Sequence, residues 1–188
     1  GAPAGGAGRG GMAPCDHNDH TGYTQIFDGK TMDGWDFAPE IFRVEGDEIV
    51  AGYNPKIPPG TTFAIYTKAE PADFDLLVEV KSDGANSGIQ FRSEALPERE
   101  VRGYQADIGA GWWGKLYEER GRGLLWPKSG EAHVKPGEWN KYAIEAKGAR
   151  VRTWINGQPC VDLTDEKLSR SGQIGLQLHS GGALEVRY

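Results

Sequence analysis

The sequence has few of the features that mark a disulfide scaffold, a membrane protein or a nucleic-acid-binding protein. Its 188 residues include only two Cys and two Met, which excludes a framework of several disulfides. No stretch approaches the roughly 20 consecutive apolar residues of a membrane span, and the amino end has no apolar core of a signal peptide. The net charge of −6 leaves no basic surplus to neutralise nucleic-acid phosphates, so a neutral or cationic partner is favoured.

The two cysteines leave a single disulfide open. Cys15 lies in a polar segment near the amino end, and Cys160 follows a strand pattern. A bridge between them would imply an oxidising compartment and would fix the amino-terminal segment to the rest of the chain. The alternative is two unrelated free thiols.

Glycine is abundant and unevenly distributed. The chain has 28 Gly and 11 Pro, which argues against a helical protein. Six of the glycines fall within the first eleven residues, and the composition there cannot bury enough apolar surface to offset the entropy of ordering. We therefore predict that residues 1–22 form an irregular Gly/Ala/Pro-rich arm that is disordered by itself.

From Tyr23 onward, short segments with apolar and polar residues in alternation are separated by turn signals. The pairs Asp83-Gly84 and Asn156-Gly157 are typical of tight turns between antiparallel strands. Hydrophobic residues make up 38% of the chain, which is enough for one packed core. Residues 23–188 are therefore predicted to form one all-β domain, a sandwich or barrel of many short strands.

Strand alternation gathers unusual polar side chains on one face of a predicted sheet. If four of the strand segments are neighbours, that face carries Gln90, Arg92, Gln105, Asp107, Tyr117, Glu119, Gln177 and His179. Amides, paired acids, an Arg and a His suit the hydroxyl groups of a saccharide, and Trp112, Trp113 and Trp126 could stack on sugar rings. The face is therefore predicted to bind a polyhydroxylated ligand, with an ordinary solvated face as the alternative.

Seven segments also match a known family in order: Tyr23–Trp35, Asn86–Arg92, Gly103–Ile108, Gly114–Glu119, Gly137–Asn140, Ile155–Gly157 and Gly172–His179. On these segments, residues 23–188 resemble the 3-keto-disaccharide hydrolase domain family. The resemblance implies a concanavalin-like or laminin-G-like jelly roll of two antiparallel sheets. It also implies a carbohydrate ligand and export in bacteria, to the periplasm or the cell exterior.

Members of that family act on sugars oxidised at C3, as hydrolases or lyases. The ketone acidifies the neighbouring C–H, so the glycosidic bond breaks by elimination and water then adds. This chemistry needs a base, an acid for the leaving oxygen, and an electrophile or a divalent metal to hold the enolate. Carried over by position, His179 or Glu119 is the expected base, and Asp107 and Glu119 are the expected ligands of a metal. The expected substrate-binding residues are Gln90, Arg92, Gln105, Tyr117, Gln177 and Trp126.

Two departures from the family pattern leave catalysis open. Family members usually continue past the position of Tyr188 with a closing strand, so either a truncated chain or an unfilled sheet edge is expected. The arm could pair with such an edge on a neighbouring copy and link non-catalytic subunits into a homo-oligomer or filament; it could also be a linker left by processing. A glycan-binding module is a further alternative. Within the arm, His17 and His20 beside Asp16 and Asp19 form a weak metal-binding pattern.

Overall fold

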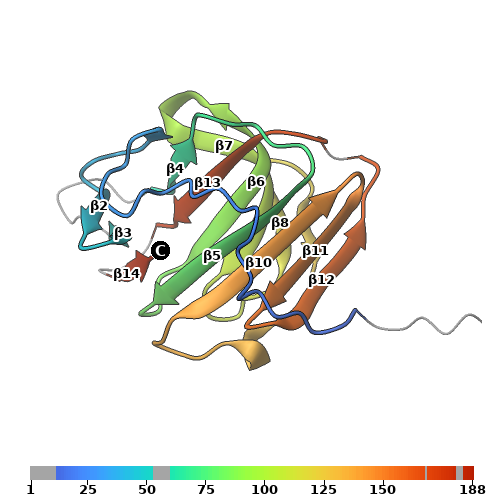
Figure 1. The fold of residues 1–188 in the computed structure, drawn as a ribbon. Helices are drawn as coiled ribbons and strands as arrows, with labels where there is room; N and C mark the ends of the chain where they lie inside the picture. The colour runs from blue at the N-terminus through green and yellow to red at the C-terminus, as the bar shows by residue number, and fades with distance from the viewer. Residues whose placement is uncertain (1–11, 53–59, 168, 181–183) are drawn as a thin grey trace, which may run out of the picture.

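The computed structural model describes residues 12–52, 60–167, 169–180 and 184–188, and in these ranges the chain is almost entirely β-structure. Two antiparallel sheets of seven strands pack face to face (Figure 1), so the predicted all-β jelly roll is confirmed. The two helical segments of the described residues are single 3₁₀ turns, η1 (Pro97–Arg99) and η2 (Glu131–His133). No helix there is long and apolar enough to span a bilayer.

Each sheet combines strands that are distant in the sequence. Sheet one has the spatial order β1 (Trp35–Asp36), β4 (Thr62–Tyr66), β13 (Gln173–Leu178), β6 (Ser87–Leu96), β7 (Glu100–Ile108), β8 (Leu116–Glu119) and β9 (Gly123–Trp126). Sheet two has the order β12 (Gln158–Thr164), β11 (Arg150–Ile155), β10 (Asn140–Lys147), β5 (Phe74–Ser82), β14 (Glu185–Arg187), β3 (Glu48–Gly52) and β2 (Phe42–Glu45).

The core lies between the two sheets and takes every second residue of the central strands. Phe91 on β6 and Tyr104 on β7 are fully buried, with ring centroids 5.5 Å apart. From sheet two, Tyr142 and Ile144 enter the same core cluster. Burying one such side chain contributes roughly 1.5–3 kcal/mol, so the alternation seen in the sequence fixes which face of each strand turns inward.

A β-bulge bends the β6–β7 hairpin. The register between the two strands shifts between Phe91 and Glu94, and Arg92 within the bulge has a φ of 47°. An extra residue on one strand increases the local bend and reverses the side-chain alternation beyond it. The hairpin therefore leaves the plane of sheet one after Phe91.

The tip of this hairpin folds over the outer face of sheet one, the face turned away from the core. Val101 packs there against Phe63 and Ile65 of β4, although β13 and β6 lie between these strands in the sheet. At the turn, Arg99 Nε donates a hydrogen bond to Asp36 Oδ1 at 2.8 Å. One side of the outer face is thereby closed off from solvent.

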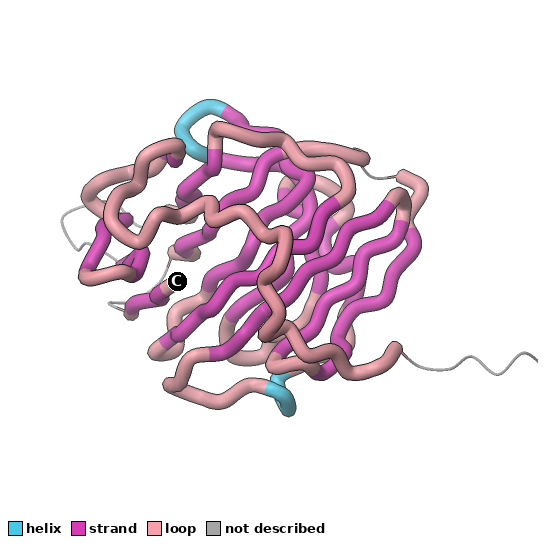
Figure 2. Tube along the Cα trace, in the orientation of Figure 1, coloured by secondary structure: helices cyan, strands magenta, loops and turns pink. Residues whose placement is uncertain are grey.

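The described part of the arm lies on the outer face of sheet two, where the loop trace crosses the strands (Figure 2). The Cys15 amide donates to the Gly157 carbonyl at 2.9 Å, and Trp154 Nε1 donates to the Ala13 carbonyl at 3.2 Å. The His17 ring lies edge-on to Trp154, with centroids 5.3 Å apart. Residues 12–20 are irregular, as expected, and are held on the domain because Trp154 and the β11–β12 turn supply partners that composition does not reveal; that the arm is disordered by itself stays a prediction. Residues 1–11 lie outside the described residues, and an assembly role for the arm stays a prediction.

The two cysteines are both free, so the disulfide left open by the sequence does not form. The Cys15 thiol is exposed, while the Cys160 thiol packs beside Gly130. Burial raises the pKa of Cys160 to about 11, which keeps it protonated and unreactive at neutral pH.

The last strand lies inside sheet two. β14 pairs with β3 on one side and with β5 on the other, so the edge strands of this sheet are β2 and β12. The unfilled edge expected near Tyr188 is therefore wrong. The Tyr188 hydroxyl reaches Ser87 Oγ and the Gln177 carbonyl, and so ties β14 to two strands of sheet one.

A charged cluster ties β7 to the loop that follows β12. The Tyr104 hydroxyl donates to Asp165 Oδ2 at 2.5 Å, and Arg122 Nη1 donates to Asp165 Oδ1 at 3.1 Å. The hydrogen bond from Arg122 is the main reason that the pKa of Asp165 lies well below its ordinary value. The stabilisation that these bonds to Asp165 give is fully present above the pKa that Asp165 has in the unfolded chain. It is lost as the pH falls through the lower pKa of Asp165 in the folded protein.

Replacing Asp165 with Asn should lower the free energy of unfolding by about 1–3 kcal/mol at pH 7, because Tyr104 and Arg122 lose a charged acceptor. In urea unfolding, the difference in the free energy of unfolding between variant and wild type should become smaller as the pH falls below about 4. The matched control is Glu166→Gln. Among the described residues, the exposed carboxylate of Glu166 pairs with Arg170, and its loss should change the free energy of unfolding by less than about 0.5 kcal/mol. Equal losses in both variants, or a gap independent of pH, would contradict this role of Asp165.

Candidate functional site

The outer face of sheet one carries a buried polar cluster. The strand order β13, β6, β7, β8 makes the four segments neighbours, as the alternation requires. Gln90, Gln105, Asp107 and Gln177 all point away from the core, and none is more than 4% exposed. Buried polar side chains are costly unless they are hydrogen-bonded, so their partners decide what this face can do.

Gln105 is the centre of a hydrogen-bonded amide network. Its Oε1 accepts from Gln90 Nε2 at 2.8 Å. Its Nε2 donates to Asp107 Oδ1 at 2.8 Å and to Gln177 Oε1 at 3.2 Å. Ser93 Oγ completes the network by donating to Gln90 Oε1 at 2.6 Å. Three adjacent strands are thereby joined through side chains that also suit sugar hydroxyls.

Gly88 on β6 leaves the space that Gln105 fills. In register, Gly88 lies between Asp107 of β7 and Gln177 of β13. A Cβ atom at this position would lie 2.4 Å from Cγ and Cδ of Gln105. Only glycine therefore allows Gln105 to reach across β6 to Gln177.

Asp107 has one oxygen without a partner. Oδ1 accepts from Gln105, while the buried Oδ2 has no hydrogen bond within the described residues. Burial is the main reason that the pKa of Asp107 rises to about 7; the nearby Glu119 raises it further, while the Gln105 hydrogen bond and Lys115 lower it. A carboxyl group that is poised near neutrality and has a free oxygen can accept or give a proton.

Glu119 and His179 border this network. Glu119 lies in register with Gly103, two residues before Gln105, and burial raises its pKa while the charge of His179 lowers it. His179 is exposed just after β13, and its Nδ1 lies 2.8 Å from the Ser180 carbonyl. The two expected bases are thus brought to the same region as Asp107, but neither is as buried as Asp107.

Lys115, which the sequence analysis did not single out, also faces this region. The Asp107 amide donates to the Lys115 carbonyl at 3.1 Å, so the two residues lie side by side on β7 and at the start of β8. Lys115 Nζ lies 5.1 Å from the ring centroid of Trp112, and Trp112 is edge-on to Tyr117 at 6.3 Å. The alternation that groups Tyr117 with Glu119 extends to Lys115 and is the signal that could have identified it.

Arg92 does not share this face, contrary to the expectation from alternation. The bulge turns its side chain toward the other sheet, where Nε donates to the Ala72 carbonyl at 2.8 Å and Nη1 to the Gly148 carbonyl at 2.6 Å. Its Nη2 lies 3.1 Å from an Asp73 oxygen. A guanidinium with three such partners has a structural position and does not face a sugar on the outer face.

Two of the three tryptophans expected to stack on sugars also lie elsewhere. Trp126 is paired with the core residue Leu116 and packs against the core. Trp113 is buried and stacked on Tyr142, with centroids 6.4 Å apart. Trp112, at 38% exposure, remains available beside Tyr117.

The described side chains do not fit a resident metal ion. Within the described ranges, no three His, Cys, Asp or Glu side chains are close enough together to hold one. Asp107 and Glu119 would supply two carboxylates only, and in the arm His17 packs on Trp154 instead of pairing with His20 as a ligand.

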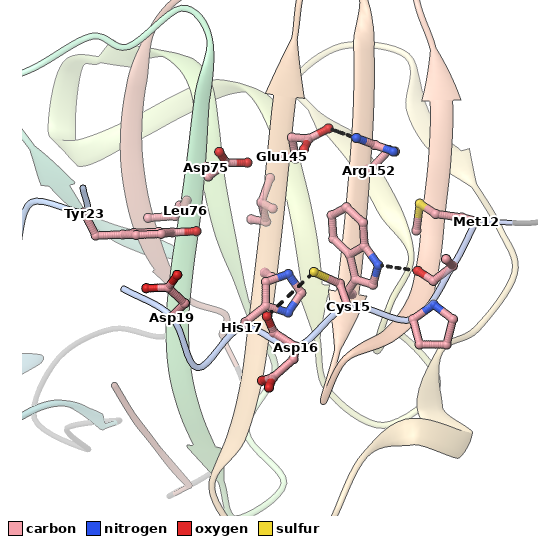
Figure 3. Close-up of a pocket in the computed structure, with 15 residues that line it drawn as sticks. Met12, Cys15, Asp16, His17, Asp19, Tyr23, Asp75, Leu76, Glu145 and Arg152 are labelled. Carbon is pink, nitrogen blue, oxygen red and sulfur yellow. Dashed lines mark hydrogen bonds and ion pairs between the residues drawn. The ribbon is translucent and has the colours of Figure 1, made fainter. Parts of the chain in front are cut away.

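A cavity of about 430 Å³ lies away from this network, between the arm and sheet two (Figure 3). Its carboxylates include Asp75, which faces Lys147 at 3.7 Å, and Glu145, which pairs with Arg152. The buried polar side-chain atoms without a partner in the described chain, Asp107 Oδ2 and Trp126 Nε1, do not line it. The cavity forms where the arm packs on sheet two. The network on sheet one instead contains Asp107, whose carboxyl group can exchange a proton near neutral pH.

Comparisons with known proteins identify a family and a fold. The family model described as a 3-keto-alpha-glucoside-1,2-lyase-like domain matches residues 22–188. No curated protein matches the sequence. A candidate glycosyl hydrolase from Parabacteroides distasonis has a TM-score of 0.65 at 22% identity, covering 89% of this chain and 91% of its own.

Two further solved structures share the architecture. The carbohydrate-binding module CBM66 from Bacillus subtilis has a TM-score of 0.60 at 17% identity, covering 82% of this chain and 91% of its own. The β-glucanase from Bacillus licheniformis has a TM-score of 0.56 at 11% identity, covering 87% and 92%. At these identities the likenesses show the jelly-roll fold alone.

Replacing Gly88 with Ala should displace Gln105 and break its bonds to Asp107 and Gln177. We expect the free energy of unfolding to fall by about 1–3 kcal/mol, because the new methyl group meets a filled space. Gly60→Ala is the control, because a Cβ there meets nothing within 4 Å, and it should stay within about 0.5 kcal/mol of wild type. If urea unfolding finds the two variants equally stable, the position of Gln105 does not depend on Gly88.

Proposed function

This chain belongs to the family of 3-keto-alpha-glucoside-1,2-lyase-like domains, and we propose that it cleaves 3-keto-glucosides on the outer face of sheet one. It is thus a carbohydrate-active, hydrolase-like or carbohydrate-binding jelly-roll domain. The observation that carries the step from this class to cleavage is the free Oδ2 of Asp107 inside a buried amide network.

The amide network provides the sugar site. Gln90, Gln105 and Gln177 come from three adjacent strands and together offer donors and acceptors on one sheet face. A glucose ring offers neighbouring hydroxyls that can replace the bonds the amides make to one another. Because the site is desolvated, each exchanged hydrogen bond also orients the sugar.

Asp107 is the proposed base. The ketone at C3 acidifies the C2–H bond, and Asp107 Oδ2 accepts that proton. The electron pair forms a C1=C2 double bond as the C1–O bond breaks, and the leaving oxygen takes up a proton and departs as an alcohol. Water then adds across the double bond, with hydroxyl at C1 and hydrogen at C2, to give the free 3-keto sugar.

Glu119 and His179 take supporting roles in this proposal. Their interaction and their position beside Gly103 and the end of β13 place them at the border of the network. Both can hold the ketone or the incoming water by hydrogen bonds. Asp107 replaces them as the base because it is the more buried and has the unpartnered oxygen.

Wild-type protein should release the aglycone from a 3-keto-glucoside and exchange the C2 hydrogen for deuterium in D₂O, as followed by NMR. Asp107→Asn should lower kcat by about 10²–10⁴-fold, because the base is lost. Wild-type kcat/KM should rise with pH through about 7, as Asp107 loses its proton. Asp47→Asn, at an exposed turn residue, is the control and should leave the rate unchanged.

Two results would contradict the proposal in different ways. Full activity of Asp107→Asn would refute the site. Saccharide binding with neither C2 exchange nor cleavage would instead assign the domain as a glycan-binding module.

A further inference from the structure

Lys115, just before β8, and Asp107 on β7 are neighbours on the outer face of sheet one. The Asp107 amide donates to the Lys115 carbonyl, and the Gly114 amide donates back to the Asp107 carbonyl at 3.3 Å. β8 then continues in register with β7, with Tyr117 opposite Gln105. Because alternate side chains share a face, Lys115 lies on the same side of the sheet as Tyr117 and Asp107.

Trp112 holds the Lys115 ammonium group. Nζ lies 5.1 Å from the centre of the Trp112 ring, within the range of a cation–π interaction. The Trp112 ring is in turn fixed edge-on to Tyr117. The lysine is therefore positioned by aromatic side chains that themselves belong to the rim of the sugar site.

The ammonium group is also free of acidic partners. Within the described ranges, the lysine ion pairs are those of Lys147 with Asp75 and Glu145, and Lys141 bonds Asn18. Lys115 is half-buried and has no such partner there, yet its charge is felt at Asp107. Three N–H donors next to the proposed base are thus left for a ligand.

Elimination needs a proton donor that remains protonated when the base is ionised. Lysine side chains in general meet this condition at neutral pH, whereas a carboxyl group that has lost its proton to act as the base does not. Alkoxide leaving groups in particular need a proton as the C1–O bond breaks.

We propose that Lys115, held on Trp112 beside Asp107, is a catalytic residue that gives a proton to the leaving oxygen. Asp107 Oδ2 takes the C2 proton, the C2–H electron pair forms the C1=C2 bond, and the C1–O pair stays on the leaving oxygen. That oxygen takes a proton from Lys115 Nζ. When water then adds, the neutral amine takes a proton from the water whose oxygen bonds to C1, and Asp107 returns its proton to C2. The inference rests on the proposed function and assigns the acid that it requires.

The test compares two leaving groups in Lys115→Met, which keeps the length of the side chain and removes its charge. With methyl 3-keto-glucoside, kcat for cleavage should fall by about 10²–10⁴-fold. With the 4-nitrophenyl analogue, whose leaving group needs no proton, the loss should be less than about tenfold. The variant should still exchange the C2 hydrogen of the methyl substrate in D₂O, because Asp107 is intact.

Lys128→Met, at an exposed lysine, is the control and should match wild type with both substrates. Equal losses for the methyl and nitrophenyl substrates would overturn the assignment, as would loss of C2 exchange or full cleavage of the methyl substrate by Lys115→Met. If wild type itself neither exchanges C2 nor cleaves, it is the proposed function that fails.

Discussion

The bulge at Arg92 is the constraint on which the outer face of sheet one depends. Its guanidinium is buried and donates to the Ala72 and Gly148 carbonyls, so the bulge is anchored to sheet two. The chain passes so close that a Cβ on Gly172 would lie 2.4 Å from the Arg92 carbonyl carbon. A bulge held at both sides cannot slip in register, and the bend of the β6–β7 hairpin follows from it.

That bend creates the environment of the polar cluster. With the hairpin tip packed on β4 through Val101, a sheet face that would otherwise be wet is closed on one side. The amides of Gln90, Gln105 and Gln177 then satisfy one another, and the carboxyl of Asp107 is left with a single bond. Burial of this kind is what moves a carboxyl pKa toward neutrality, so the reactivity of the site is a consequence of tertiary packing.

The outer faces of the two sheets differ in what they hold. Sheet one holds the polar network, with Trp112 and Tyr117 at its open side. Sheet two is covered by the described part of the arm, which uses Trp154 as its anchor. Trp154 lies on the outer face of sheet two, and residues of the arm cover its indole ring. The core between the sheets separates the two surfaces.

The sequence by itself determined the class of fold and most of the polar face. Alternation is a local property with a period of two, so it predicted a shared face for Gln90, Gln105, Asp107 and Gln177 on the condition that their strands are neighbours. The structure meets that condition, because β13, β6 and β7 are adjacent in sheet one. The same reasoning extends to Lys115, which shares its alternation with Tyr117.

Tertiary structure decided the features that depend on an interruption of strand alternation or on contact with a residue far away in the sequence. Alternation fails at Arg92, because a bulge adds a residue that no local pattern announces. Trp126, which was expected to bind sugar, packs against the core beside the register shift between β8 and β9. Composition predicted that the arm is disordered by itself, and it could not show that residues 12–20 are held by hydrogen bonds to Trp154 and Gly157, which the fold places beside them. Packing also decides that Asp107 has a carboxyl oxygen without a partner, because this depends on how three strands bring their amides together.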